Sequence, residues 1–313
     1  MRPVTVLILH PPAAPDARDP VRWLAAAREI VAERHRAAFE TAGAESVRIV
    51  SQDGRPLTFG ERLRALAREI VEATPPGRRH GLVVIGSGAM PLARRSDLEE
   101  FVRVARSVAR RPVALANSYY SADAVAIPDA AILLALPDLP ADNALPRWLA
   151  ERAGVPVRDR RNVWRLGLDI DSPLDVVLIA GDPGCPRALR LLAREIVAGS
   201  PDLAGALRGV MAALDDRRAE LLVAGRSSSR TLRWLEGRAQ CRVRALIEER
   251  GLRSSTSLAL GDLDEERDEP PVVPAASIRF GPPRSVLGLL LDESGPRLLT
   301  TVVAQLGDAA ILD

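Results

Sequence analysis

Two apolar runs constrain the fold of this chain more than any other feature. Residues 4–9 (VTVLIL) and 81–85 (GLVVI) are almost entirely apolar and rich in β-branched side chains. A strand with one exposed face alternates apolar and polar residues, whereas a continuous apolar run indicates a strand that is covered on both faces. Helices on both sides of a sheet provide that cover. The chain is therefore expected to form an α/β sheet between two layers of helices.

The rest of the first half carries the alternating pattern that this fold requires. Apolar residues at helical spacing predict helices at residues 23–42, 61–73, 96–110 and 146–153. Ser96 is the expected N-cap of the third helix, because Glu99 follows at capping-box spacing. Further strands are expected at residues 46–50, 112–116, 124–127 and 130–135. Strands that alternate with helices through short loops favour a largely parallel sheet.

The pattern changes near residue 180. The chain has 313 residues, enough for one large or two modest domains. Residues 1–180 carry the α/β pattern, whereas residues 181–313 begin with strongly helical segments and are expected to form a smaller α/β or helical region. Within that region, residues 262–274 are acidic and proline-rich, which is typical of an exposed loop.

Composition excludes several classes of partner. The net charge of +2 and the aromatic content of 3% argue against a nucleic-acid partner. The apolar run near the N-terminus is too short for a signal peptide or a membrane span, so we expect a cytoplasmic protein with no membrane partner. All 43 basic residues are arginine, so a phosphate group must be held by arginine, by backbone amides or by a metal ion.

Residues 166–180 (LGLDIDSPLDVVLIA) contain the strongest candidate site. Asp169 and Asp171 are two positions apart, which places both on the same side of an extended segment. Ser172 and Pro173 then predict the start of a helix, with Asp175 near its positive end. Divalent cations prefer oxygen ligands, so Asp169 and Asp171 are candidate magnesium ligands. The alternative is an acidic turn that only caps the helix.

Three segments resemble nucleotidyltransferases of the GT-A fold. In residues 81–102, a strand is followed by Met-Pro-Leu and by a helix that opens with Asp-Leu, as in that family. Residues 168–179 (LDIDSPLDVVLI) resemble the family's Asp-x-Asp-Thr-Pro-x-Asp signature, which supplies a metal contact. Residues 141–157 (ADNALPRWLAERAGVPV) look like the Asn-Ala-Leu segment of the guanylyltransferases that build deazaflavin cofactors. The resemblance covers residues 1–180.

This resemblance implies a Rossmann-like GT-A sheet, a nucleoside triphosphate, magnesium and a small phosphorylated or carboxylated acceptor. Asp169 and Asp171 would hold the metal, and Asn143 would contact the substrate. Asn117 belongs to a polar cluster at residues 117–123 that follows a buried strand, where open α/β sheets bind ligands. The candidate nucleotide-binding residues are His10, Gly86, Ser87, Gly88, Asn117 and Asn143. His35 lies among arginines and is expected to be solvated.

The chain departs from the family pattern at two points. The family has a glycine-rich loop after its first strand, whereas this chain has Pro11 and Pro12, which lack amide donors. Arg18 or Arg22 would have to replace the basic residue of that loop. Residues 86–88 (GSG) stand where the first metal-binding acid is expected. The chain is therefore either an active nucleotidyltransferase or a degenerate, non-catalytic binding or assembly module, with residues 181–313 as a partner or homodimer surface.

Overall fold

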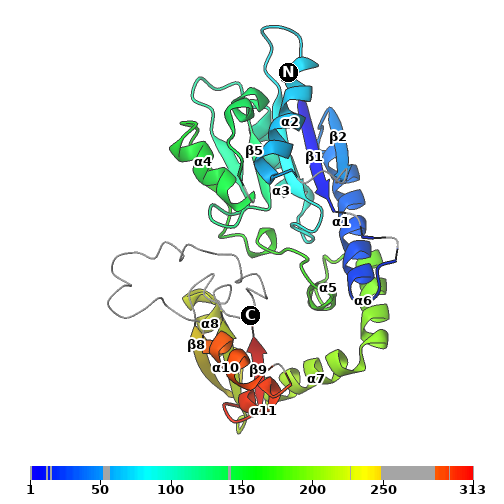
Figure 1. The fold of residues 1–313 in the computed structure, drawn as a ribbon, viewed down its shortest axis with the longest axis vertical. Coiled ribbons are helices and arrows are strands. Elements are labelled where there is room, and N and C mark those ends of the chain that lie inside the picture. Colours follow the sequence, from blue (N-terminus) through cyan, green and yellow to red (C-terminus); the bar gives the residue numbers. More distant parts are fainter. Residues whose placement is uncertain are drawn as a thin grey trace, which may run out of the picture. The chain divides into compact units, whose positions relative to one another are not determined.

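The computed structural model describes residues 2–11, 13–14, 16–51, 57–139, 142–225, 227–247, 286–295 and 297–312. They form two compact units, Met1–Gly199 and Ser200–Asp313 (Figure 1). The first unit extends beyond residue 180, where the sequence suggested a boundary. The reason is that the helix at Arg187–Gly199 belongs to it: Nε1 of Trp23 donates to Glu195 at 3.1 Å. The acidic stretch at residues 262–274 lies outside the described residues.

The first unit contains a six-stranded mixed sheet in the order β2-β1-β3-β5-β4-β6. Its strands are β1 (Val4–His10), β2 (Ser46–Ser51), β3 (Gly81–Gly86), β4 (Ala114–Ala116), β5 (Ala124–Ile127) and β6 (Val157–Asp159). β1 runs parallel to β2 and β3, and β4 runs parallel to β6, whereas β5 is antiparallel to both of its neighbours. The loop between β4 and β5 is too short for the crossover that a parallel pair needs. The sheet is therefore mixed rather than largely parallel.

Helices cover both faces of this sheet, as the apolar runs predicted. The helices of the first unit are α1 (Val21–Thr41), α2 (Phe59–Glu72), α3 (Arg95–Ala105), α4 (Leu145–Glu151), α5 (Pro173–Ile179) and α6 (Arg187–Gly199). Val6 and Ile8 of β1 pack in one core with α1 and α3, and Leu7 packs in a second core with α2 and α4. Neighbouring side chains of β1 therefore pack in the cores on opposite faces of the sheet. This explains why apolar and polar residues do not alternate along the strand.

Two local predictions in this unit are wrong. Residues 130–135 form a 3-10 helix, η1 (Ala130–Ala135), rather than a strand, because the Asp129 side chain caps it by accepting the Ala131 amide at 3.1 Å. α3 begins one residue earlier than expected, so Ser96 is not its N-cap. Its capping contact is made by Asp97, whose carboxylate accepts the Arg94 amide at 2.8 Å.

The second unit contains a small parallel sheet in the order β8-β7-β9. Its strands are β7 (Glu220–Gly225), β8 (Arg242–Ile247) and β9 (Ala309–Leu312). Its described helices are α7 (Pro201–Asp215), α8 (Ser229–Glu236), α10 (Val286–Ser294) and α11 (Leu299–Val303). Of the helices in the described ranges, none combines the length and apolarity needed to cross a bilayer.

Candidate functional site

A pocket of about 280 Å³ lies at one edge of the six-stranded sheet. The ends of β1 and β3 contribute Leu9 and Gly86, and the start of β5 contributes Ala124. Because β5 is antiparallel, its first residue lies at the same edge as the last residues of β1 and β3. The carboxyl ends of strands in open α/β sheets are where ligands usually bind.

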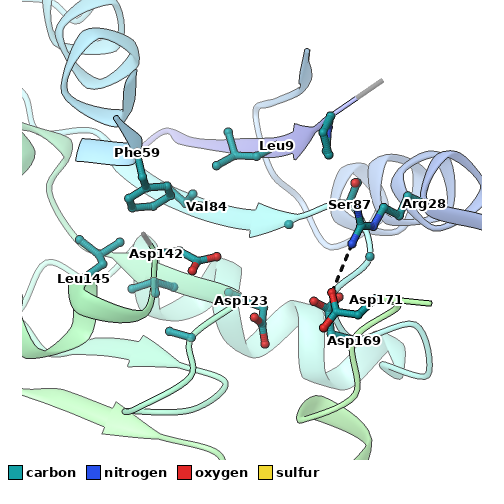
Figure 2. A pocket seen from close by; sticks show the side chains of 16 residues that line it. Leu9, Arg28, Phe59, Val84, Ser87, Asp123, Asp142, Leu145, Asp169 and Asp171 are labelled. Atoms are coloured by element: carbon teal, nitrogen blue, oxygen red, sulfur yellow. Dashed lines mark hydrogen bonds and ion pairs between the residues drawn. The ribbon is translucent and has the colours of Figure 1, made fainter. Parts of the chain in front are cut away.

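The pocket has an apolar side and a charged side (Figure 2). Phe59, Val84 and Leu145 lie together on one side. Four carboxylates also line the pocket, from Asp123, Asp142, Asp169 and Asp171. Of the described residues that line it, Arg28 is the only basic one. The pocket therefore carries an excess of acidic groups beside an apolar wall.

The loop that carries the acidic pair is tied to the turn after β3. The Met90 amide donates to Leu168 O at 2.8 Å, and the Ile170 amide donates to Gly88 O at 3.2 Å. A Cβ atom at Gly88 would lie 2.8 Å from Oδ1 of Asp169 and 3.0 Å from Ile170 O. Only glycine therefore allows the loop to pack this closely, and this packing holds Asp169 at the pocket.

The environment of Asp169 disfavours its ionised form. Burial, and then the charges of Asp123 and Asp171, raise the pKa of the Asp169 carboxyl to about 7. Burial also raises the pKa of Asp142. The side chain of Asp171 is 77% exposed and pairs with Nη2 of Arg28 at 3.2 Å. The interior of the pocket thus holds negative charge that one arginine does not balance.

Helix capping does not explain Asp169 and Asp171. α5 begins at Pro173 with Ser172 as its N-cap and a capping box completed by Asp175, as predicted. The Asp175 carboxylate accepts the Asp171 and Ser172 amides at 3.0 Å and 2.7 Å. The acidic pair ahead of the helix is therefore left with its side chains at the pocket.

The Gly86-Ser87-Gly88 turn lines the pocket, but most of its amides bond within the protein. The Gly86 amide donates to Asp123 O at 2.9 Å, and the Ser87 amide donates to Leu9 O at 2.9 Å. This arrangement is a tight turn rather than an amide cradle for phosphate. The Ser87 hydroxyl is different: the side chain is 2% exposed, and its Oγ has no hydrogen-bond partner among the described residues.

Asn117 is fully buried and does not line the pocket, in contrast to its predicted role. Its Nδ2 donates to Oδ2 of Asp123 and to Leu166 O, both at 3.0 Å. Its Oδ1 accepts the Asp123 and Ala124 amides at 3.0 Å and 3.1 Å. Asn117 therefore positions Asp123, which is the residue that reaches the pocket.

His10 and Asn143 lie next to lining residues rather than among them. His10 ends β1 between Leu9 and Pro11, and burial lowers its pKa. Asn143 follows Asp142 in η2 (Asp142–Ala144). Nδ1 of His10 and Oδ1 of Asn143 are buried and lack hydrogen-bond partners among the described residues. Both are thus close to the pocket without forming its wall.

The expectation that His35 is solvated is wrong. His35 is fully buried on α1, and burial lowers its pKa to about 4, so the ring is neutral at pH 7. Its Nε2 lies 2.7 Å from Ala89 O, and a carbonyl only accepts, so Nε2 carries the proton. His35 therefore fastens α1 to the turn after β3.

Arg28 and Asp142 also line the pocket, although the sequence does not predict either of them there. Arg28 is one arginine among 43 basic residues, and no motif marks it. Asp142 opens the short η2 turn, in which its Oδ1 accepts the Asn143 amide at 2.8 Å. The one sequence signal for this region was the resemblance of residues 141–157 to the Asn-Ala-Leu segment. Arg22, expected near phosphate, instead pairs with Asp19 and Glu195 at 2.9 Å and 3.2 Å.

The pocket offers carboxylates, the oxygen ligands that magnesium prefers, but its described residues do not form a complete set of ligands. Among the described residues, no three side chains of His, Cys, Asp or Glu form a group that encloses an ion. Magnesium commonly binds through one or two carboxylates, with substrate phosphates and water completing its octahedron. Asp169 and Asp171 supply such a pair, and the negative charge around Asp169 favours a cation.

No protein-family model matches the chain, and no curated protein matches it.

Proposed function

We propose that the first unit is a nucleotidyltransferase of the GT-A type. It binds a nucleoside triphosphate with magnesium and transfers the nucleotidyl group to a small phosphorylated or carboxylated acceptor. One observation carries the proposal: Asp169 and Asp171, the pair that resembles the family signature, line a pocket at the ligand-binding edge of the sheet.

The charge balance of the pocket makes nucleotide binding depend on the metal. Four carboxylates and one arginine line it, so a free triphosphate would be repelled. Asp169 and Asp171 would hold magnesium, which neutralises phosphate charge and orients the phosphates when bound. Phe59, Val84 and Leu145 offer an apolar wall on which a planar base packs.

The chemistry requires little from the protein beyond positioning. An acceptor oxygen attacks the α-phosphorus in line, the bond from the α-phosphorus to the bridging oxygen breaks, and pyrophosphate leaves. A phosphate or carboxylate acceptor is already ionised at neutral pH, so no general base is needed. The chain's own contribution is to orient the two reactants and to place charge around the reacting phosphate.

Thermal shift of the full chain with GTP, CTP and ATP, with and without magnesium, tests the binding step. We expect at least one nucleotide to raise the melting temperature only when magnesium is present. The double variant Asp169→Asn with Asp171→Asn should abolish that rise. Asp138→Asn, which removes an exposed carboxylate outside the pocket, should keep it. If no nucleotide shifts the wild-type protein at any magnesium concentration, the proposal is wrong.

The second candidate is a degenerate module that binds a nucleotide without turnover. The amides of Gly86 and Ser87 favour it, because they bond inside the protein and leave no amide cradle for the triphosphate. Pyrophosphate release in the presence of phosphorylated and carboxylated acceptors separates the candidates. Release that depends on the acceptor and on Asp169 supports the enzyme. Magnesium-dependent binding without release, together with a homodimer in sedimentation, supports the module.

A further inference from the structure

The pocket needs a phosphate-binding group that the expected elements do not supply. Phosphate recognition uses positive charge and N–H donors. The chain contains no lysine, and the Gly86 and Ser87 amides donate within the protein. Arg22 pairs with two acidic residues away from the pocket. These observations leave Arg28 as the basic residue to consider, since it is the only one among the described lining residues.

Arg28 is held at the pocket by two contacts of different kinds. From α1, its Nε donates to the backbone oxygen of Ile170 at 3.0 Å. Its Nη2 donates to Oδ1 of Asp171 at 3.2 Å. The first acceptor belongs to a loop that is bonded to the turn after β3, so it is fixed. The second belongs to a carboxylate whose side chain is 77% exposed, and an ion pair with such a partner is weak.

A cation at the acidic pair changes the balance between these contacts. The carboxylate of Asp171 would then be shared with the ion, and the ion would repel the guanidinium of Arg28. The Nε bond to Ile170 O does not involve that carboxylate, so it remains as a pivot. The Nη groups are released next to the metal, where phosphate oxygens would complete its coordination. A guanidinium fork matches two phosphate oxygens at once.

We propose that Arg28 is the phosphate-binding residue of this pocket. Its guanidinium stays paired with the carboxylate of Asp171 until a divalent cation binds. This inference rests on the proposed function. It adds an order of binding steps: the cation binds first, the ion pair between Arg28 and Asp171 breaks, and the guanidinium then binds the phosphate. The chain thereby replaces a glycine-rich loop with one arginine whose availability depends on the metal.

Calorimetric titration of the full chain tests this assignment with two probes, magnesium alone and inorganic triphosphate at saturating magnesium. Arg28→Gln should bind magnesium alone about 2- to 5-fold more tightly, because Asp171 loses its competing partner. The same variant should bind inorganic triphosphate about 10- to 100-fold more weakly, because a charge-assisted contact is lost. Arg28→Lys should fall between these values for triphosphate, since it keeps the charge without the fork.

Arg28→Gln is expected to raise the affinity for magnesium and to lower the affinity for triphosphate. These opposite changes distinguish a phosphate-binding role from a structural one. Arg22→Gln, on the same helix but outside the pocket, is the matched control and should leave both affinities unchanged. If Arg28→Gln weakens both affinities together, or leaves triphosphate binding unchanged, Arg28 does not bind phosphate and the proposed function still stands. If the wild-type protein binds neither magnesium nor triphosphate, the proposed function is wrong and this inference falls with it.

Discussion

Replacing Asp169 with asparagine should stabilise the first unit at high pH. The Asp169 pKa rises from an ordinary 3.8 to about 7 in the folded state. The folded state therefore favours the protonated carboxyl. Below the pKa of the unfolded state, Asp169 is protonated in both states and does not change the free energy of unfolding. The cost of ionising Asp169 in the folded state grows as pH rises from about 4 to about 7 and then levels off. A shift of this size corresponds to a free-energy cost on the order of 4 kcal/mol at full ionisation.

Asparagine removes the charge and keeps an oxygen that can accept the Ile170 amide, as Oδ1 of Asp169 does at 2.9 Å. We expect the variant to gain about 2 to 4 kcal/mol at pH 8 and less than about 1 kcal/mol at pH 4. For a unit of this size, the gain at pH 8 raises the melting temperature by roughly 5 to 15 °C.

Thermal unfolding in buffers that contain a chelator, at pH 4 and pH 8, measures this difference. Asp171→Asn is the matched control, because its side chain is 77% exposed and its removal should change stability by less than about 1 kcal/mol. A loss of stability in the Asp169 variant at pH 8, or an equal gain at both pH values, would refute the electrostatic reasoning.

Three further predictions follow from the same site. Gly88→Ala places a methyl group 2.8 Å from Oδ1 of Asp169, so it should cost about 1 to 3 kcal/mol of stability in denaturant unfolding and weaken magnesium binding in calorimetry. Asn117→Ala removes four buried or partly buried hydrogen bonds, two of them to Asp123, and should cost about 2 to 5 kcal/mol in the same unfolding assay. Magnesium affinity in the wild-type protein should rise by up to about tenfold per pH unit below pH 7 and level off above it, because proton and cation compete for Asp169; calorimetry between pH 5 and pH 8 measures this.

The fold was predictable where the pattern is local. The apolar run in β1 identified a strand covered on both faces, because Val4, Val6 and Ile8 enter one core while Leu7 and Leu9 pack in the other. Residues 130–135 were mistaken for a strand, since a short apolar run does not distinguish a strand from a buried helical turn. The cap from Asp129 and the packing of Leu133 in the core with α2 decide the outcome.

The site was predictable only in part, for a related reason. Asp169 and Asp171 are recognisable because the helix start directly follows them, and the structure brings them to a pocket with Gly86, Ser87 and Gly88. The role of Arg28 depends on how α1 lies against a loop far along the chain, and no sequence pattern encodes that contact. Asn117 was expected to bind a ligand, but its side chain bonds to Asp123 and Ala124 in its own loop and to the distant Leu166 O, contacts that no sequence pattern shows.

The acidic pocket costs the folded unit stability, and its structural contacts do not account for that cost. The N-terminus of α5 is already capped by Ser172 and Asp175, so Asp169 is not needed there. The charge of Arg28, which pairs with the exposed Asp171, lowers the pKa of Asp169, but burial and the charges of Asp123 and Asp171 outweigh it. Strongly perturbed carboxyls in a pocket are characteristic of functional sites. In the proposed function, a divalent cation would offset the repulsion that adds to the effect of burial on the Asp169 pKa, and part of this cost would become binding free energy.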